Sequence, residues 1–112
     1  MEVKIKIWLE KDGLNVLGDG RLKLLRTIDE VGSINAAAEK LGISYRHAWG
    51  HLKKLEERLG CKLIEPRTGG KGGGGTTLTA GAKRFLSDFE KIRKEIDSHV
   101  KEKFEGFDMR KD

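Results

Sequence analysis

The sequence lacks most of the features that would tie it to a membrane or to a disulfide framework. Cys61 is its only cysteine, Pro66 is its only proline, and aromatic residues make up 6% of the chain. A single cysteine excludes an intrachain disulfide and favours a reducing, cytoplasmic setting. No apolar run approaches the roughly 18 residues that a membrane span needs, and the charged N-terminus is unlike a signal peptide. We therefore expect no membrane partner.

The sequence also lacks a catalytic constellation. No serine, histidine and acidic residue form a triad pattern, and no pair of carboxylates stands in an apolar setting. The glycine-rich residues 69–75 invite a phosphate-loop interpretation, but Gly72 follows Lys71 where that motif needs a magnesium-binding Ser or Thr. We predict a protein that is not an enzyme and has no cofactor.

Two histidines at helical spacing and the single cysteine are the residues that we consider as metal ligands. His47 and His51 are four residues apart, which is a metal-ligand spacing on a helix, but no glutamate stands between them as in zinc proteases. Cys61 is distant along the chain and is expected in the core. Contact of the histidines with DNA or solvent is the favoured interpretation, and metal binding is the alternative.

Positive charge, by contrast, is abundant and unevenly placed. The net charge is +5, and residues 44–84 hold nine basic and three acidic residues. The rest of the chain is nearly balanced. This asymmetry favours a polyanion-binding surface in the second half of the chain.

Residues 32–59 have the spacing of a helix-turn-helix. Ser33 and Ser44 stand where N-caps belong, because a serine hydroxyl accepts a bond from an unpaired N–H of the first turn. Gly42 stands where the first helix should end in a left-handed conformation. We predict two helices around a short turn, the second of which enters the DNA major groove.

The predicted second helix has an apolar side and a basic side. Ala48, Leu52 and Leu55 recur at helical spacing, whereas the opposite side is basic until Glu57. Side chains of its first turn can bond base edges or phosphates, although a solvated basic surface is the simpler alternative. The residues of this motif that we expect to contact DNA are Ser33, Ser44, Tyr45, Arg46, His47, Gly50, Lys53 and Lys54.

A glycine-rich hairpin follows this helix. Short strands at residues 61–65 and 76–79 flank the glycine loop and together resemble the wing of a winged helix-turn-helix. A loop without side chains lets backbone N–H groups approach phosphates closely, although it also suits an unconstrained hairpin tip. The wing residues that we expect to contact DNA are Arg67, Thr68, Lys71 and Thr76.

The two ends of the chain have different periodicities. Val3, Ile5, Ile7 and Leu9 alternate with polar residues, which predicts a half-buried strand, a turn at residues 11–13 and a returning strand at residues 14–17. A first helix should follow and end near residue 31. Trp8, on the lysine side of the strand, is expected to be exposed or to contact a partner chain.

A long helix is predicted from residue 80 to about residue 104. At ~1.5 Å per residue it would be about 37 Å long, so a domain of this size cannot bury its whole apolar stripe. Packing on the same helix of a second chain is the favoured interpretation, and folding back on the N-terminal hairpin is the alternative. The residues expected at the dimer interface are Phe85, Phe89, Ile92, Ile96, Val100 and Phe104.

Several motifs together resemble a known family. Gly42-Ile43-Ser44-Tyr45, Ala48-Trp49, the GGKGGGG run and Leu78-Thr79 resemble the N-terminal domain of ModE-type, molybdate-responsive regulators, and the broader pattern is similar to LysR-type regulators. The resemblance implies a dimeric winged helix-turn-helix on a two-fold operator. That family also carries C-terminal molybdate-binding domains without a counterpart here. We therefore expect a separate effector-sensing protein or a signal other than molybdate.

The sequence thus predicts a mainly α fold with small β elements. It comprises a winged helix-turn-helix at residues 1–79 with its wing at 62–79, a dimerisation helix at 80–105 and a flexible tail at 106–112. The predicted function is that of a homodimeric transcriptional regulator that binds a palindromic operator. The alternatives are a sequence-independent DNA-coating protein and a winged helix that binds a protein.

Overall fold

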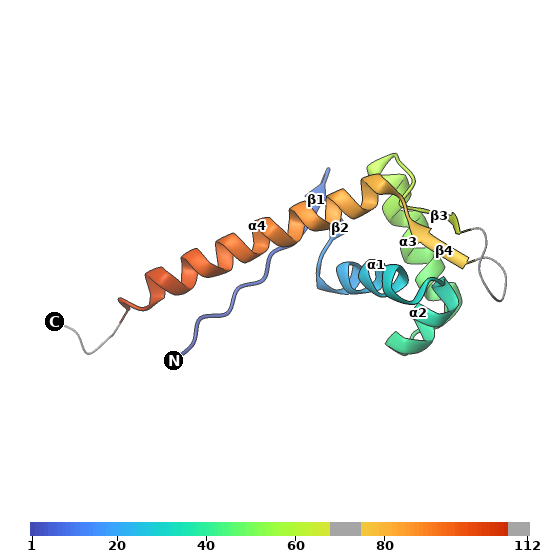
Figure 1. The fold of residues 1–112 in the computed structure, drawn as a ribbon. Helices are drawn as coiled ribbons and strands as arrows, with labels where there is room; N and C mark the ends of the chain where they lie inside the picture. Colours follow the sequence, from blue (N-terminus) through green and yellow to red (C-terminus); the bar gives the residue numbers. More distant parts are fainter. Residues whose placement is uncertain (68–74, 108–112) are drawn as a thin grey trace.

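The computed structural model describes residues 1–67 and 75–107 of the chain. Helices α1, α2 and α3 and the wing hairpin form a head, from which α4 extends as a rod (Figure 1). The predicted architecture, mainly helical with two small hairpins, is confirmed. The elements are β1 (Leu9–Lys11), β2 (Leu14–Leu17), α1 (Asp19–Val31), α2 (Ile34–Leu41), α3 (Tyr45–Leu59), β3 (Ile64–Arg67), β4 (Gly75–Leu78) and α4 (Ala80–Phe104).

The helix-turn-helix is delimited by the predicted capping residues. The Ser33 hydroxyl accepts a hydrogen bond from the Ala36 N–H at 2.9 Å, and the Ser44 hydroxyl accepts one from the His47 N–H at 3.0 Å. Gly42 ends α2 with φ of 70°, a conformation that costs glycine little. The local chemistry of these residues therefore sets where α2 ends and α3 begins.

The core lies among α1, α2, α3 and the first half of α4. Leu25 and Ile28 of α1 and Leu52 and Leu55 of α3 are at most 1% exposed. Each such side chain contributes about 1.5–3 kcal/mol when it is removed from water. This packing fixes α3 against the rest of the head with one side buried.

The wing is held to α3 by a buried carboxylate. Glu56 is only 8% exposed, and its Oε2 accepts a hydrogen bond from the Leu63 N–H at 2.8 Å. The hairpin that follows is antiparallel, with Ile64 opposite Leu78 and Arg67 opposite Gly75. The residue before β3 thus takes its position directly from α3.

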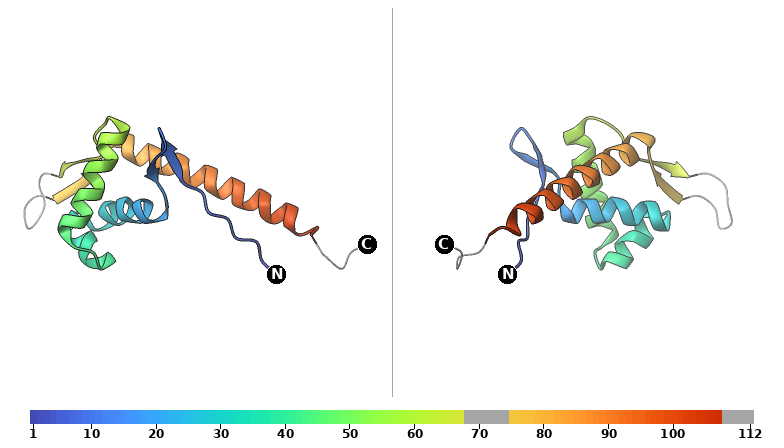
Figure 2. Two further views of the ribbon diagram at one scale, coloured as in Figure 1. Left: turned by 180° about the vertical axis from the view of Figure 1, so that it is seen from behind. Right: turned by 60° about the vertical axis from the view of Figure 1, so that its left-hand side comes forward.

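The predicted N-terminal strand is only partly correct. The β-ladder is limited to Leu9–Lys11, and residues 1–8 are extended without a strand partner. The alternation does describe burial, because Ile5 and Ile7 are half-buried while Lys6 is exposed. The ladder stops because β2 has four residues and leads directly into α1, so no strand in the described part of the chain pairs with residues 1–8. This segment instead runs beside α4 (Figures 1 and 2).

The expectations for the start of the wing also need correction. The strand expected at residues 61–65 begins at Ile64, and Cys61 is exposed and not part of the core. Gly60 ends α3 in a left-handed conformation with φ of 71°, and this turn carries Cys61 outward. The buried position is Leu63, two residues further on.

Helix α4 belongs partly to the core. Phe89 is 4% exposed and Phe85 is partly buried against the core, so both side chains pack within this protomer. Their expected place at a dimer interface stays a prediction. Sequence periodicity did not reveal this burial because one stripe continues from the buried half into the distal half of the helix. Ile92 and Ile96 are 52% and 41% exposed. The expected tail, residues 106–112, lies mostly outside the described residues.

Three ion pairs join α4 to α1. Arg93 contacts Asp19 at 2.9 Å, Arg26 contacts Glu90 at 2.7 Å, and Lys83 lies 4.0 Å from Asp29. Exposed pairs of this kind add little stability, but they favour one orientation of the two helices. Within residues 1–67 and 75–107, no helix is both long enough and apolar enough to cross a membrane.

Replacement of Glu56 by alanine should destabilise the protein by about 1–3 kcal/mol, because it leaves the buried Leu63 N–H without a partner. Glu56→Gln keeps a carbonyl acceptor at the same position and is the matched control. The free energy of unfolding in urea measures both variants. Equal losses in the two variants would show that the hydrogen bond to Leu63 does not hold the wing.

Candidate nucleic-acid interface

The side of α3 that faces away from the core carries the predicted DNA-contacting residues. Arg46, Gly50 and Lys54 are spaced by four residues, so they lie along one line of the helix, and all three are exposed. The stripe of Ala48, Leu52 and Leu55 is buried on the other side. Burial of the stripe therefore presents the basic line to solvent.

The first turn of α3 combines exposed side chains with the positive end of a helix. Tyr45 is 51% exposed and Arg46 is exposed beside it. The N-terminus of a helix attracts anions because its N–H groups and its dipole point outward. The hydroxyls of Ser33 and Ser44 accept their capping bonds, and each retains an O–H that can donate.

The two flanks of α3 differ in chemistry. On one flank the Lys53 ammonium lies 4.6 Å from the centre of the Trp49 ring and 4.0 Å from Glu56, which holds the wing. On the opposite flank the Nε2 atoms of His47 and His51 are 2.9 Å apart. Lys53 is thus partly engaged within the protein, whereas Lys54 is exposed.

The histidine pair has no third ligand for a metal in the described part of the chain, where no three His, Cys, Asp or Glu side chains cluster. Burial lowers the pKa of His51, and the nearby charges of His47, Arg21 and Lys54 lower it further. Positive neighbours repel a cation as well as a proton. The surroundings of the pair therefore favour an anion over a metal ion.

The base of the wing contacts the junction of α1 and α2. The Thr76 N–H donates to the Gly32 carbonyl at 2.8 Å, and the Arg67 guanidinium lies over Gly32, where an added Cβ would be 3.0 Å from Nη1. A Cβ on Gly75 would lie 2.3 Å from the Gly32 oxygen. Two glycines thus permit this close approach, which places Arg67 and Thr76 beside the residue before Ser33.

Not every predicted site residue is described by the structure. Thr68 and Lys71, with most of the glycine run, lie outside the described residues. Sequence reasoning singled out Arg67 and Thr76 but missed their contact with Gly32. The only signal was a pair of glycines at positions 32 and 75, and sequence spacing does not reveal that they meet.

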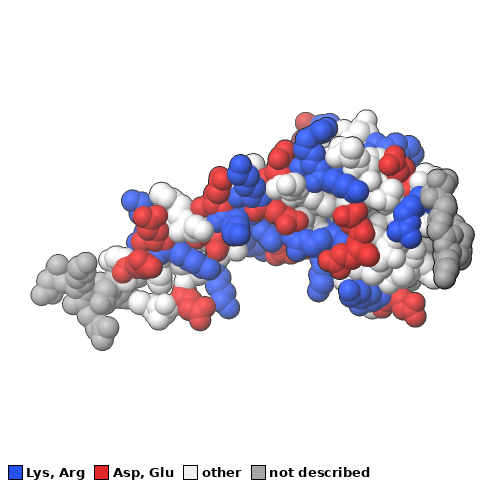
Figure 3. All heavy atoms as spheres, viewed as in Figure 1, with Lys and Arg blue, Asp and Glu red and all other residues white. Residues whose placement is uncertain are grey.

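Charge is distributed differently on α4. Basic and acidic side chains alternate along this helix (Figure 3). Several of them form ion pairs, such as Lys101 with Asp97 at 3.0 Å. The rod is therefore electrostatically mixed, and the best candidate surface for a polyanion is α3 with the base of the wing.

Comparison with known sequences agrees with this geometry. The model of the family described as "Bacterial regulatory helix-turn-helix protein, lysR family" matches residues 20–83. The chain is 42% identical over 74 residues to the transcriptional regulator ModE of Haemophilus influenzae, covering 66% of this chain and 29% of that protein. It is 39% identical over 70 residues to the DNA-binding transcriptional dual regulator ModE of Escherichia coli, covering 62% of this chain and 27% of that protein.

Solved structures share the fold. The CbnR DNA-binding domain, in a crystal structure with DNA, aligns with a TM-score of 0.55 and 28% identity over 72% of this chain and 87% of that chain. The chain spans about three-tenths of the length of the ModE relatives that it matches. These matches confirm the resemblance seen in the motifs, and they confirm a family of regulators, not of enzymes.

Gly50 offers a direct test of the exposed face. A Cβ at this position meets no atom of the described residues within 4 Å, so Gly50→Ala should raise the free energy of unfolding by about 0.5–1 kcal/mol. Gly75→Ala, the same change at the crowded wing base, should lower it. Urea denaturation compares the two. Destabilisation by Gly50→Ala would mean that this face of α3 is covered.

Proposed function

The chain belongs to the lysR family of bacterial regulatory helix-turn-helix proteins, and we propose that it is a transcriptional regulator that binds a specific operator as a dimer. One observation supports this proposal above the others. Helix α3 is held by its buried stripe so that its capped N-terminus and its basic line are exposed beside the wing. This is the geometry that a recognition helix needs.

In this proposal α3 lies in the major groove. Arg46 is the candidate for base reading, since a guanidinium bonds guanine through two atoms at once. Ser44 and Tyr45 bond base edges or nearby phosphates, and Lys54 bonds phosphates without regard to sequence. The exposed, side-chain-free Gly50 lets the helix backbone approach the DNA closely. Arg67 and the rest of the wing contact the flanking backbone.

The dimer is proposed from the distal half of α4. Ile92, Ile96, Val100 and Phe104 recur every four residues beyond the part of the helix that the head buries. The N-terminal segment faces a different side of α4, near Arg93 and Asp97. Two copies joined along this stripe would present their α3 helices to half-sites about 34 Å apart. The expected separate effector-sensing protein stays a prediction.

Competition binding against random DNA, across genomic fragments of the host and at two salt concentrations, tests the proposal. Enrichment of a few palindromic sites is the expected result. Binding without enrichment would favour the sequence-independent DNA-coating protein. An absence of duplex binding at both salt concentrations would favour a winged helix that binds an acidic protein.

Replacement of Arg46 by alanine should weaken binding to an enriched site by about 5- to 150-fold, since a bidentate contact to guanine discriminates by about 1–3 kcal/mol. Binding to random duplex should change much less. Lys91→Ala on α4 is the control for the loss of one exposed positive charge. Fluorescence anisotropy measures both affinities, and equal losses on both duplexes would contradict base reading by Arg46.

Replacement of Ile96 by lysine should raise the dissociation constant of the dimer by about ten-fold or more, because a charge would replace an apolar side chain on each of two chains. Glu95→Lys, at the exposed neighbouring position, changes charge without touching the stripe. Sedimentation equilibrium measures the association. A dimer that Ile96→Lys leaves intact would place the interface elsewhere.

A further inference from the structure

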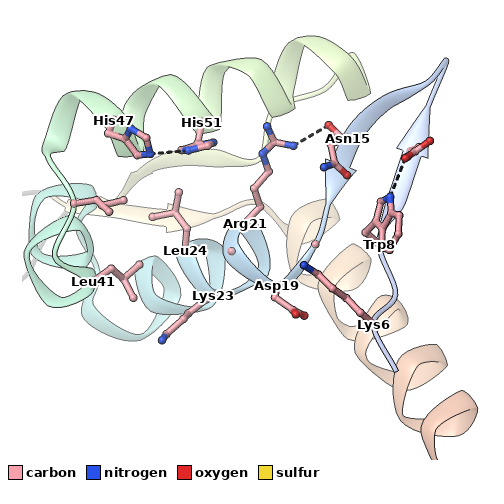
Figure 4. A pocket seen from close by; sticks show the side chains of 14 residues that line it. Lys6, Trp8, Asn15, Asp19, Arg21, Lys23, Leu24, Leu41, His47 and His51 are labelled. Atoms are coloured by element: carbon pink, nitrogen blue, oxygen red, sulfur yellow. Dashed lines mark hydrogen bonds between the residues drawn. The ribbon is translucent and has the colours of Figure 1, made fainter. Parts of the chain in front are cut away.

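A groove between α1 and α3 gathers positive charge on the flank of α3 that faces away from the wing. Its volume is about 810 Å³, and it is lined by Arg21 of α1, by His47 and His51 of α3 and by residues of the N-terminal hairpin (Figure 4). The end of α2 and the turn after it contribute only Leu41 and Ile43. The proposed function assigns no role to Arg21 or His51.

The arginines of this region are held by backbone and not by carboxylates. Arg21 Nη1 donates to the Asn15 carbonyl at 2.8 Å, and Arg58 Nη1 donates to the same oxygen. Among the residues that the structure describes, Arg21 and Arg58 form no ion pair. Two guanidinium groups therefore converge on one neutral acceptor, and their charges are left uncompensated.

Two carboxylates line the groove, and each has a partner. Asp19 pairs with Arg93 at 2.9 Å, and Glu10 accepts a hydrogen bond from the Trp8 indole at 2.8 Å. The other charged groups that line it, Lys6 and Lys23, are positive. The groove therefore has an excess of cationic groups.

Two polar atoms inside this cluster have no partner. Arg21 Nε and His51 Nδ1 are both buried without a hydrogen bond to any residue that the structure describes. Burial and the charge of Arg58 lower the pKa of Arg21, and burial with the charges of His47, Arg21 and Lys54 lowers that of His51. The Arg21 Nε–H, a buried donor in a cluster of like charges, is stabilised by a negative ligand.

We propose that this groove binds a phosphate-type oxyanion through Arg21 and the His47–His51 pair. The inference rests on the proposed function for its biological context, because a helix in the major groove has a phosphate backbone along each side. The wing lies on the Glu56 side of α3. His47, His51, Lys54 and Arg58 recur at helical spacing along the opposite flank and would meet the second backbone.

The histidine pair makes this contact dependent on pH. At 2.9 Å, one Nε2 donates its hydrogen to the lone pair of the other, so the pair offers no outward donor there. Protonation puts a hydrogen on both atoms, separates the rings and frees two donors for an oxyanion. Affinity for the anion should therefore rise as the pH falls, and the bound anion should raise the pKa of His51.

Duplex binding by the full chain between pH 7.5 and 5.5 provides the first test. Wild-type affinity should rise about three- to five-fold more than that of His51→Gln, which keeps a polar side chain but cannot be protonated. At pH 5.5 the slope of log K against log salt should be smaller by about one in the variant. His99→Gln on α4, outside the groove, is the matched control and should behave as wild type.

A second measurement distinguishes the source of the anion and does not depend on DNA binding. Inorganic phosphate, titrated at constant ionic strength against chloride, should shift the NMR ring signals of His47 and His51 to saturation if the groove takes a free anion. Shifts with duplex alone would identify the backbone phosphate. If neither phosphate nor duplex shifts these signals, and His51→Gln has the same pH and salt profiles as wild type, the proposed anion site is wrong. Base reading by α3 would be unaffected. Absence of duplex binding by wild type would contradict the proposed function. The phosphate titration alone would then show whether the groove binds an anion.

Discussion

The arrangement of the head depends on the burial of one stripe of α3. Once Ala48, Leu52 and Leu55 are removed from water, the 3.6-residue period fixes what every other position of the helix faces. Arg46 and Gly50 turn outward, His47 and His51 turn toward α1, and Glu56 turns toward the wing. Burial of one apolar stripe thus determines which residues of α3 face solvent, which face the groove beside α1 and which contact the wing.

The second constraint is the continuity of α4. Its first half is part of the head core through Ala82, Leu86 and Phe89, and the ion pairs with α1 favour one angle between the two helices. Its second half carries the exposed stripe on the same uninterrupted rod. A rod fixed at one end cannot reorient at the other without bending. The direction of α3 relative to a partner chain would therefore be set inside each protomer.

The features that were predictable from the sequence are those that neighbouring residues determine. Ser33, Ser44 and Gly42 act on the turn in which they stand, so the boundaries of α2 and α3 followed from residue type alone. The features that the sequence did not reveal concern residues whose environment comes from distant segments. The strand at residues 3–9 needed a partner backbone, and the burial of Phe89 in the core depends on segments that are distant along the chain. The meeting of Gly75 with Gly32 is another long-range event.

The same distinction applies to charge. Counting along the chain located the positive excess after residue 44, but Arg21 reaches the flank of α3 from α1 only through folding. The ion pairs of α1 with α4 use Asp19, which would otherwise be the nearest acid for Arg21 on its own helix. Formation of the α1–α4 interface therefore compensates the negative charge of one carboxylate that lines the groove beside α3. The packing that orients the rod thereby leaves the surface around the recognition helix more positive than its local sequence indicates.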